Sequence, residues 1–131
     1  MKMSHLGIAV KSIETSVVMY KESLGWKEIT KLTYDPVQKV NILFMIDNHE
    51  NKFELLEPVG NDSPIDKMLE RRIGLYHICY EVQDIDMEIK ELTKTGFLLI
   101  SGPVVAVAFD GRMIAFLINR DNLIIELLEH N

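Results

Sequence analysis

Apolar residues alternate with polar or small residues near the start of the chain, and the same pattern returns 72 positions later. Along residues 3–10, Leu6, Ile8 and Val10 occupy one face of a predicted strand, and His5 lies on the other face. Residues 75–82 repeat this pattern, with His77 in the position of His5. The alternation therefore predicts two equivalent strands, each with one apolar face and one face that carries a histidine.

A helical period follows each of these strands. Residues 11–24 place one apolar residue every three or four positions, in the order Ile13, Val17, Tyr20 and Leu24. Gly25 is a typical residue to end such a helix, because glycine adopts the left-handed conformation at low cost. The second half repeats the pattern with Ile85, Ile89 and Leu92 and ends at Gly96.

Shorter alternating segments predict the remaining strands. Residues 34–36 (Tyr-Asp-Pro) predict a turn, residues 101–103 (Ser-Gly-Pro) interrupt the second half, and residues 104–110 fit a strand or an ordered loop equally well. A short helix is expected after Ser63-Pro64, because serine caps a helix and proline suits its first position. The other predicted strands are residues 26–33, 38–46, 52–57, 97–100, 113–118 and 123–128.

The chain therefore reads as an internal repeat. Each unit consists of a strand, a helix and three further strands, which predicts an α+β protein built from two βαβββ modules. We expect one domain over residues 1–131, with a first module at residues 1–57, a connection with a short helix at residues 58–74, and a second module at residues 75–131.

Two glutamates complete the repeat. Glu54 follows His5 by 49 positions, and Glu126 follows His77 by the same distance. Apolar neighbours flank each glutamate, so both carboxylates are expected on the strand face opposite the helix. A buried carboxylate is costly unless it is compensated, and a cation is a natural compensation for four such residues. His5, Glu54, His77 and Glu126 are thus candidate ligands of one metal ion.

Composition narrows the function classes. The chain has 131 residues and a net charge of −6 without a Lys/Arg block, which argues against a nucleic-acid partner. The longest apolar run is too short to span a bilayer, and no secretory signal is expected at the start. A single cysteine, Cys79, cannot form an internal disulfide. A cytoplasmic protein that acts on a small molecule is the expectation.

Two imidazoles and two carboxylates suit Ni, Co or Zn, with Mn or Fe as further options. A six-coordinate ion would keep two positions for water or substrate. Such an ion can polarise a carbonyl while a neighbouring carboxylate carries a proton. The chemistry favoured by the residues is therefore proton abstraction α to a carbonyl.

The chain resembles the vicinal oxygen chelate (VOC) superfamily, in its glyoxalase I and methylmalonyl-CoA epimerase branch. The resemblance covers the whole chain and is carried by residues 5–10, 53–58, 62–65, 77–85, 115–117 and 125–129. It implies paired βαβββ modules in a curved mixed sheet around a cleft, one divalent metal held by His5, Glu54, His77 and Glu126, and a homodimer.

Within that branch, the resemblance departs from the epimerases at Val37. Epimerases of the family carry a glutamate just before the third strand, where this chain has Val37. The resemblance therefore favours a metal-dependent lyase or isomerase of the glyoxalase I (lactoylglutathione lyase) type, acting on a thiohemiacetal. Glu126 or Glu54 would be the catalytic base, with no preference between them. Arg112 could bind a substrate anion or form a surface ion pair.

Three alternatives remain open. The first is a methylmalonyl-CoA epimerase-like racemisation of an acyl-CoA. The second is a non-catalytic binding or resistance protein, against which the complete ligand set argues. The third is a metal-dependent oxygenase, which usually needs only two histidines and one carboxylate.

Overall fold

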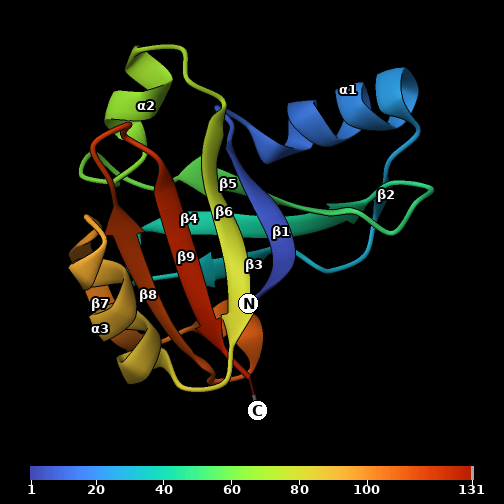
Figure 1. Cartoon of the computed structure of the whole chain (residues 1–131). Helices are drawn as coiled ribbons and strands as arrows, with labels where there is room; N and C mark the ends of the chain where they lie inside the picture. Colours follow the sequence, from blue (N-terminus) through green and yellow to red (C-terminus); the bar gives the residue numbers. More distant parts are fainter. Residues whose placement is uncertain (131) are drawn as a thin grey trace. The chain divides into compact units, whose positions relative to one another are not determined.

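A computed structural model describes residues 1–130 of the chain (Figure 1). It contains both helices and strands, which confirms the predicted α+β class. The elements occur in the order β1 (Lys2–Ala9), α1 (Ile13–Leu24), β2 (Lys27–Glu28), β3 (Thr33–Asp35), β4 (Val40–Ile46), β5 (Lys52–Pro58), α2 (Asp66–Glu70), β6 (Leu75–Val82), α3 (Ile85–Lys94), β7 (Leu98–Val105), the 3-10 turn η1 (Val107–Phe109), β8 (Met113–Ile118) and β9 (Ile124–Glu129).

The strands belong to one open, mixed sheet with the order β2-β4-β5-β1-β6-β9-β8-β7, and β3 pairs with β4. The pairs β1–β5 and β6–β9 are parallel. The pairs β4–β5 and β8–β9 are antiparallel, as are the outer pairs in each half. Each half thus follows its first strand with a helix and ends with a strand that pairs with the first strand in parallel.

The chain divides into two compact units. One unit is His5–Tyr76, and the other combines Met1–Ser4 with His77–Asn131. The first four residues therefore belong with the second half of the chain, and the connection that carries α2 belongs with the first half. The division falls within β1 and within β6.

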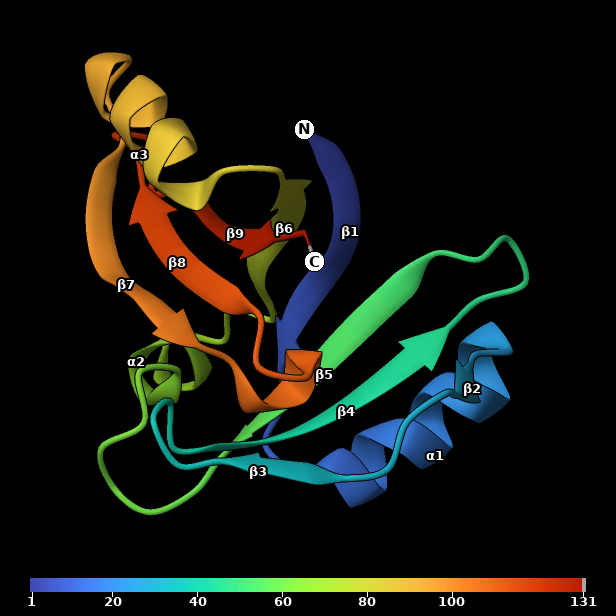
Figure 2. The same ribbon diagram turned by 90° about the horizontal axis from the view of Figure 1, so that it is seen from below.

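In the His5–Tyr76 unit, helix α1 packs on strands β4 and β5 (Figure 2). Ser12 caps the helix by accepting a hydrogen bond from the Thr15 N–H, and Gly25 ends it with φ 71°. The core between helix and strands is apolar and comprises Val10, Ile13, Val17, Leu43, Met45 and Leu55.

In the other unit, helix α3 packs on β7, β8 and β9 (Figure 2). Asp84 caps this helix by accepting a hydrogen bond from the Met87 N–H. Its core comprises Val82, Ile85, Ala115, Leu117, Ile125 and Leu127, and all of these except Ile125 lie 72 positions after a core residue of the first unit. The repeat therefore extends from the sequence pattern to the packed core.

Two predicted segments of the first half differ in the structure. The single strand expected at residues 26–33 is two short strands, β2 and β3. Between β2 and β3, the Thr30 hydroxyl accepts a hydrogen bond from the Phe44 N–H of β4 at 2.9 Å. A side-chain oxygen thus takes the place of a main-chain carbonyl at this point of the sheet. The turn predicted at residues 34–36 begins later, at Pro36, because Tyr34 and Asp35 still pair with β4.

In the second half, the break predicted at residues 101–103 is wrong. Strand β7 continues through this segment, with irregular register on both sides of Ser101. Gly102 has φ 88° and is followed by a cis peptide bond to Pro103. Proline is tolerated here because β7 is an edge strand and a bulge needs no ladder donor. Residues 104–105 complete the strand, and residues 107–109 form η1.

Within residues 1–130, none of the helices is both long enough and apolar enough to cross a membrane.

Candidate metal centre

The first histidine–glutamate pair lies in the His5–Tyr76 unit. Strands β1 and β5 run in parallel, and their register sets Gly7 beside Glu54. His5 is two residues earlier on the same face of β1. Its Nε2 lies 3.3 Å from Oε1 of Glu54, and the two side chains are 1% and 3% exposed. His5 and Glu54 therefore form a buried pair within this unit.

The second pair has the same construction in the other unit. Strands β6 and β9 are parallel, with Cys79 beside Glu126. Nε2 of His77 lies 3.2 Å from Oε1 of Glu126, and both side chains are buried. Each pair thus uses a histidine from the first strand of its half and a glutamate from the last.

Each imidazole packs against a phenylalanine in a T-shaped arrangement. Phe44 meets the His5 ring at 90° with a centroid separation of 5.2 Å, and Phe116 meets the His77 ring at 81° and 5.4 Å. These phenylalanines are 72 positions apart, so the sequence repeat contained the signal that locates them. A buried ring held in this way loses little additional freedom when its nitrogen binds a ligand.

The apolar neighbours of the glutamates face the helices, as predicted. Leu55 is in the core with α1, and Leu127 is in the core with α3. Because successive side chains of a strand point to opposite faces, Glu54 and Glu126 lie on the faces away from the helices.

A second repeated glutamate was not assigned a role from the sequence. Oε2 of Glu57 accepts the Ile13 N–H at 3.2 Å, and Oε2 of Glu129 accepts the Ile85 N–H at 2.9 Å. Each carboxylate therefore satisfies a free amide in the first turn of its helix, where negative charge is also favoured. The signal in the sequence was the common spacing of 44 residues between helix start and glutamate.

The donor chemistry of His5, Glu54, His77 and Glu126 suits a divalent ion, and these four residues are a candidate group of metal ligands. All four are at most 2% exposed. Burying a carboxylate costs several kcal/mol without a compensating charge. Each carboxylate lies beside the histidine of its own unit, at 3.3 Å for Glu54 and 3.2 Å for Glu126. Neutral imidazole nitrogens and carboxylate oxygens are ordinary ligands of Zn, Ni and Co.

Arg112, the predicted substrate-binding residue, has protein partners. Its Nε donates a hydrogen bond to the Glu129 carbonyl oxygen at 2.8 Å, and Nη2 lies 3.7 Å from Oε1 of Glu81. Nδ1 of His130 lies 3.6 Å from the other oxygen of Glu81. These contacts favour the ion-pair interpretation of Arg112, and its role in substrate binding stays a prediction.

Each half of this α+β protein has a first strand, a helix and further strands, and each half carries a buried His–Glu pair that is a candidate for metal binding. The family model for the glyoxalase/bleomycin resistance protein/dioxygenase superfamily matches residues 4–116. The chain belongs to this superfamily, which is the one that the sequence resembles.

Two curated relatives are both named as methylmalonyl-CoA epimerases. An ethylmalonyl-CoA/methylmalonyl-CoA epimerase of Cereibacter sphaeroides is 32% identical, over 92% of this chain and 90% of the relative. The mitochondrial methylmalonyl-CoA epimerase of Homo sapiens is 31% identical, over 92% of this chain and 68% of the relative. The relatives therefore support an epimerase or isomerase, and the predicted glyoxalase I-like lyase gains no support from them.

Solved structures share the fold. A hypothetical protein of Bacillus halodurans superposes with a TM-score of 0.85 and is 34% identical, over 99% of this chain and 94% of the other. The methylmalonyl-CoA epimerase of Mycobacterium tuberculosis superposes with a TM-score of 0.83 at 22% identity, over 99% and 88% of the two chains. These matches confirm the predicted VOC fold.

Proposed function

We propose that this protein is an acyl-CoA epimerase that inverts the carbon between the thioester and the carboxylate of a 2-alkylmalonyl-CoA such as methylmalonyl-CoA. One observation carries the proposal, namely the two equivalent buried His–Glu pairs in a chain related to two epimerases. The reaction needs a proton to leave one face of that carbon and to return on the other. Two equivalent carboxylates, one from each half of a repeat, suit this requirement.

His5, Glu54, His77 and Glu126 would together hold one divalent ion, with Ni, Co and Zn preferred by their chemistry. When bound, such an ion would polarise the thioester carbonyl and thereby acidify the adjacent C–H. Holding an ion would also compensate the two buried carboxylates. Stoichiometric metal uptake by stripped protein, with a rise in Tm, is the expected result. Uptake that persists in a His5→Ala/His77→Ala double variant would count against this ligand set.

Glu54 and Glu126 are the proposed proton carriers. Each lies beside a histidine nitrogen, and a carboxylate in such a site can take a proton from the substrate carbon. Glu54 would serve one face of the carbon and Glu126 the other. This assignment uses ligand carboxylates as bases, as the resemblance implies, but for inversion at one carbon rather than transfer to its neighbour.

Val37 supports this choice of bases. It is 64% exposed in the turn after β3, and it carries no ionisable group at the position where epimerases of the family have a glutamate. The nearest carboxylate in sequence, Asp35, is buried and already accepts hydrogen bonds from Val37 N–H, Gln38 N–H and the Gln38 side-chain amide. An Asp35 engaged in this way is a poor proton carrier.

Solvent deuterium exchange tests the proposed reaction. The metal-stripped protein is reloaded with Ni, Co or Zn and incubated in D₂O with methylmalonyl-CoA or ethylmalonyl-CoA, and the deuterium at the inverted carbon is measured. Exchange with racemisation is expected. Methylglyoxal with a thiol is the parallel substrate, and a lactoyl thioester formed without exchange into either malonyl thioester would overturn the proposal in favour of glyoxalase chemistry.

Val37→Glu sharpens the test without touching the candidate ligands. Because Val37 is exposed, this substitution is expected to leave the fold intact. If Glu54 and Glu126 already provide both bases, the added carboxylate changes the exchange rate by less than about threefold. A much faster rate in the variant would mean that the native protein lacks a second base.

The homodimer implied by the resemblance is part of the same proposal. Light scattering of the purified protein checks it, with twice the 15.1 kDa chain mass as the expected result.

A further inference from the structure

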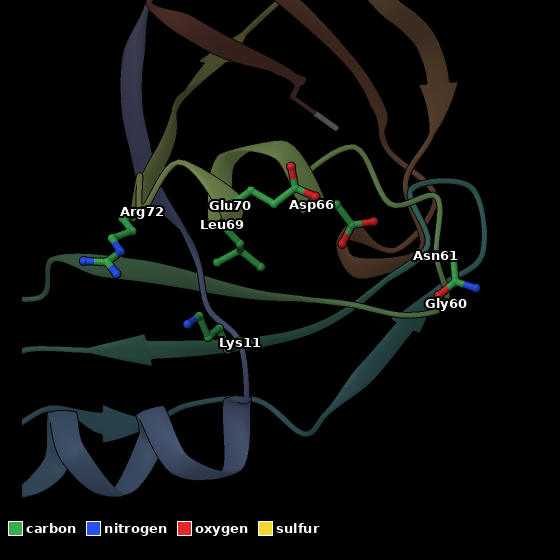
Figure 3. Close-up of a pocket in the computed structure, with 7 residues that line it drawn as sticks. All are labelled: Lys11, Gly60, Asn61, Asp66, Leu69, Glu70 and Arg72. Atoms are coloured by element: carbon green, nitrogen blue, oxygen red, sulfur yellow. The ribbon is translucent and has the colours of Figure 1, made fainter.

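A cavity of about 500 Å³ lies beside the short helix α2, within the His5–Tyr76 unit. We call it the α2 pocket (Figure 3). Its walls come from the segment after β1, the turn after β5, helix α2 and the residue that follows the helix. The lining residues are Lys11, Gly60, Asn61, Asp66, Leu69, Glu70 and Arg72. Its size is that of a small-molecule site, and the proposed reaction does not otherwise use it.

Two uncommitted cations occupy one end of the α2 pocket. Figure 3 shows the Lys11 and Arg72 side chains on the same side, with Asn61 at the opposite side and the carboxylates between. Within residues 1–130, neither the Lys11 ammonium nor the Arg72 guanidinium takes part in an ion pair or a side-chain hydrogen bond. Ammonium and guanidinium groups together are the usual partners of phosphate.

The acidic residues of the pocket have different roles. Oδ2 of Asp66 accepts the Ser63 N–H at 3.0 Å, so this carboxylate is already used by the turn that starts α2. Glu70 is exposed, and within the part of the chain that the structure describes its carboxylate takes part in no such bond. A carboxylate and the Asn61 amide can accept from, and donate to, the edge of an adenine base. The pocket therefore offers phosphate contacts at one end and base contacts at the other.

Arg72 is held at the pocket by an uncommon backbone conformation. Its φ is 59°, in the left-handed region that normally favours glycine after a helix. Its N–H donates to the Leu69 carbonyl at 3.1 Å. Because arginine and not glycine occupies this position after the helix, a cationic side chain lines the α2 pocket.

The spacing along the strands connects the pocket with the first His–Glu pair. Lys11 is six residues after His5, and Gly60 is six residues after Glu54. Since β1 and β5 are parallel, both segments run toward the same edge of the sheet, about 20 Å at most from the pair. An extended pantetheine arm is of similar length, equivalent to about five extended residues.

We propose that the α2 pocket binds the nucleotide end of the CoA thioester. The phosphates would lie against Lys11 and Arg72, and the adenine amino group against Glu70 and Asn61. This inference rests on the proposed function, because it takes the substrate to be an acyl-CoA. It adds the residues that would recognise the carrier instead of the reacting carbon.

Direct binding tests the pocket separately from catalysis. Adenosine 3′,5′-bisphosphate, which matches the phosphorylated end of CoA, is titrated into the wild type by calorimetry. Lys11→Gln and Arg72→Gln are each expected to weaken binding by roughly tenfold. Arg71→Gln and Lys67→Gln remove neighbouring charges that do not line the pocket, and less than about a twofold change is expected for them. Absence of binding to the wild type, or equal losses in the control variants, overturns the proposal.

Turnover distinguishes a failed pocket from a failed reaction. With the CoA thioester, Lys11→Gln/Arg72→Gln is expected to raise KM while kcat stays within about twofold of wild type. With the truncated methylmalonyl-pantetheine, the same variant is expected to match the wild type. Exchange activity that is equally affected with both substrates contradicts the pocket proposal. Bisphosphate binding that depends on Lys11 and Arg72, in a protein that exchanges no thioester, supports the pocket and rejects the epimerase.

Discussion

The two halves of the chain share the geometry of their His–Glu pairs but differ around Glu81 in the second half. The two nitrogen–oxygen distances are 3.3 Å and 3.2 Å, and each imidazole makes a T-shaped contact with a phenylalanine. By contrast, Glu81, Arg112 and His130 form an ionic group in the second half. The positions 72 residues earlier are Ala9, Val40 and Pro58, which are apolar.

This difference indicates which side-chain contacts of the repeat can vary between the halves and which cannot. An ionic group with partly exposed members contributes little to stability, so either half can adopt it or replace it by apolar packing. The buried pairs have no such freedom, because losing one partner leaves an uncompensated buried group. Agreement between the halves is therefore a better guide to the site than the chemistry of any single residue.

The largest effect is expected from breaking one pair at a time. Glu54→Gln and Glu126→Gln keep the side-chain volume but remove the charge and the proton-accepting oxygen. Each is expected to lower deuterium exchange by about a hundredfold or more. Equal losses would mean that both glutamates carry protons, whereas a loss confined to one would assign a single base.

Glu129→Gln is the matched control for Glu126→Gln. It lies three residues away on β9, on the opposite face, and Gln retains an oxygen that can accept the Ile85 N–H. Its exchange rate is expected to stay within about threefold of the wild type.

The next effect concerns β7, which has no counterpart of equal length in the first half. A Cβ at Gly102 would lie 2.5 Å from the Ile114 carbonyl oxygen and 3.0 Å from the Ala115 Cα. Gly102→Ala must therefore shift backbone in addition to straining φ 88°. We expect a loss of about 3 kcal/mol in the free energy of unfolding, measured with urea.

Gly96→Ala provides the control for Gly102→Ala. Gly96 also has a positive φ, 108°, but an added Cβ would find no atom within 4 Å. Its loss should be confined to backbone strain, about 1 kcal/mol. Equal losses in the two variants would contradict the close approach between β7 and β8.

A smaller effect is expected when the helix-capping glutamates are removed. Glu57→Ala and Glu129→Ala each leave one amide of a first helical turn without its acceptor, at a cost of about 1 kcal/mol. The Glu129 bond is shorter, 2.9 Å against 3.2 Å, so its removal should cost slightly more. Thermal unfolding of the two variants measures this, and a clear reversal of the order would contradict the bond geometry.

The smallest effect comes from two equivalent turns. Oδ1 of Asp47 accepts the His49 and Asn51 N–H groups, and Oδ1 of Asn119 accepts the Asp121 and Leu123 N–H groups. Hydrogen bonds from the Asn51 side chain and the turn amides lower the pKa of Asp47 below its ordinary value of 3.8. A lowered pKa stabilises the folded turn above pH 3.8, and this contribution is lost as the pH falls through the folded pKa.

Hydrogen exchange by NMR compares the two turns as the pH is lowered from 5 to about 2. Protection of the Asn51 backbone N–H should decrease relative to that of the Leu123 backbone N–H. The acceptor of the first, Asp47, is protonated at low pH, whereas the acceptor of the second, Asn119, does not titrate. Asp47→Asn is expected to abolish the difference. A parallel decrease in both turns of the wild type would contradict the assignment to Asp47.

The sequence predicted the equivalent features because the repeat reports each of them twice. Helices α1 and α3, the strands that carry the histidines and glutamates, and the choice of His5, Glu54, His77 and Glu126 as candidate ligands all follow from the 72-residue offset. It could not predict the division between β2 and β3, since that depends on the Thr30 hydroxyl reaching Phe44 across the sheet. Nor could it predict that Arg112 reaches the Glu129 carbonyl, because this contact has no counterpart at Val40.

Strand β5 carries Glu54 on one face and Glu57 on the other, and β9 does the same with Glu126 and Glu129. A slip of either strand by one residue would therefore withdraw the glutamate from its histidine and, in the same movement, withdraw the cap from its helix. The register of one strand thus sets both the position of the helix and the alignment of the His–Glu pair. A residue inserted between Glu54 and Glu57 would allow only one of these two glutamates to keep its contact. The three-residue spacing therefore fixes the distance between the helix cap and the His–Glu pair in each half of the chain.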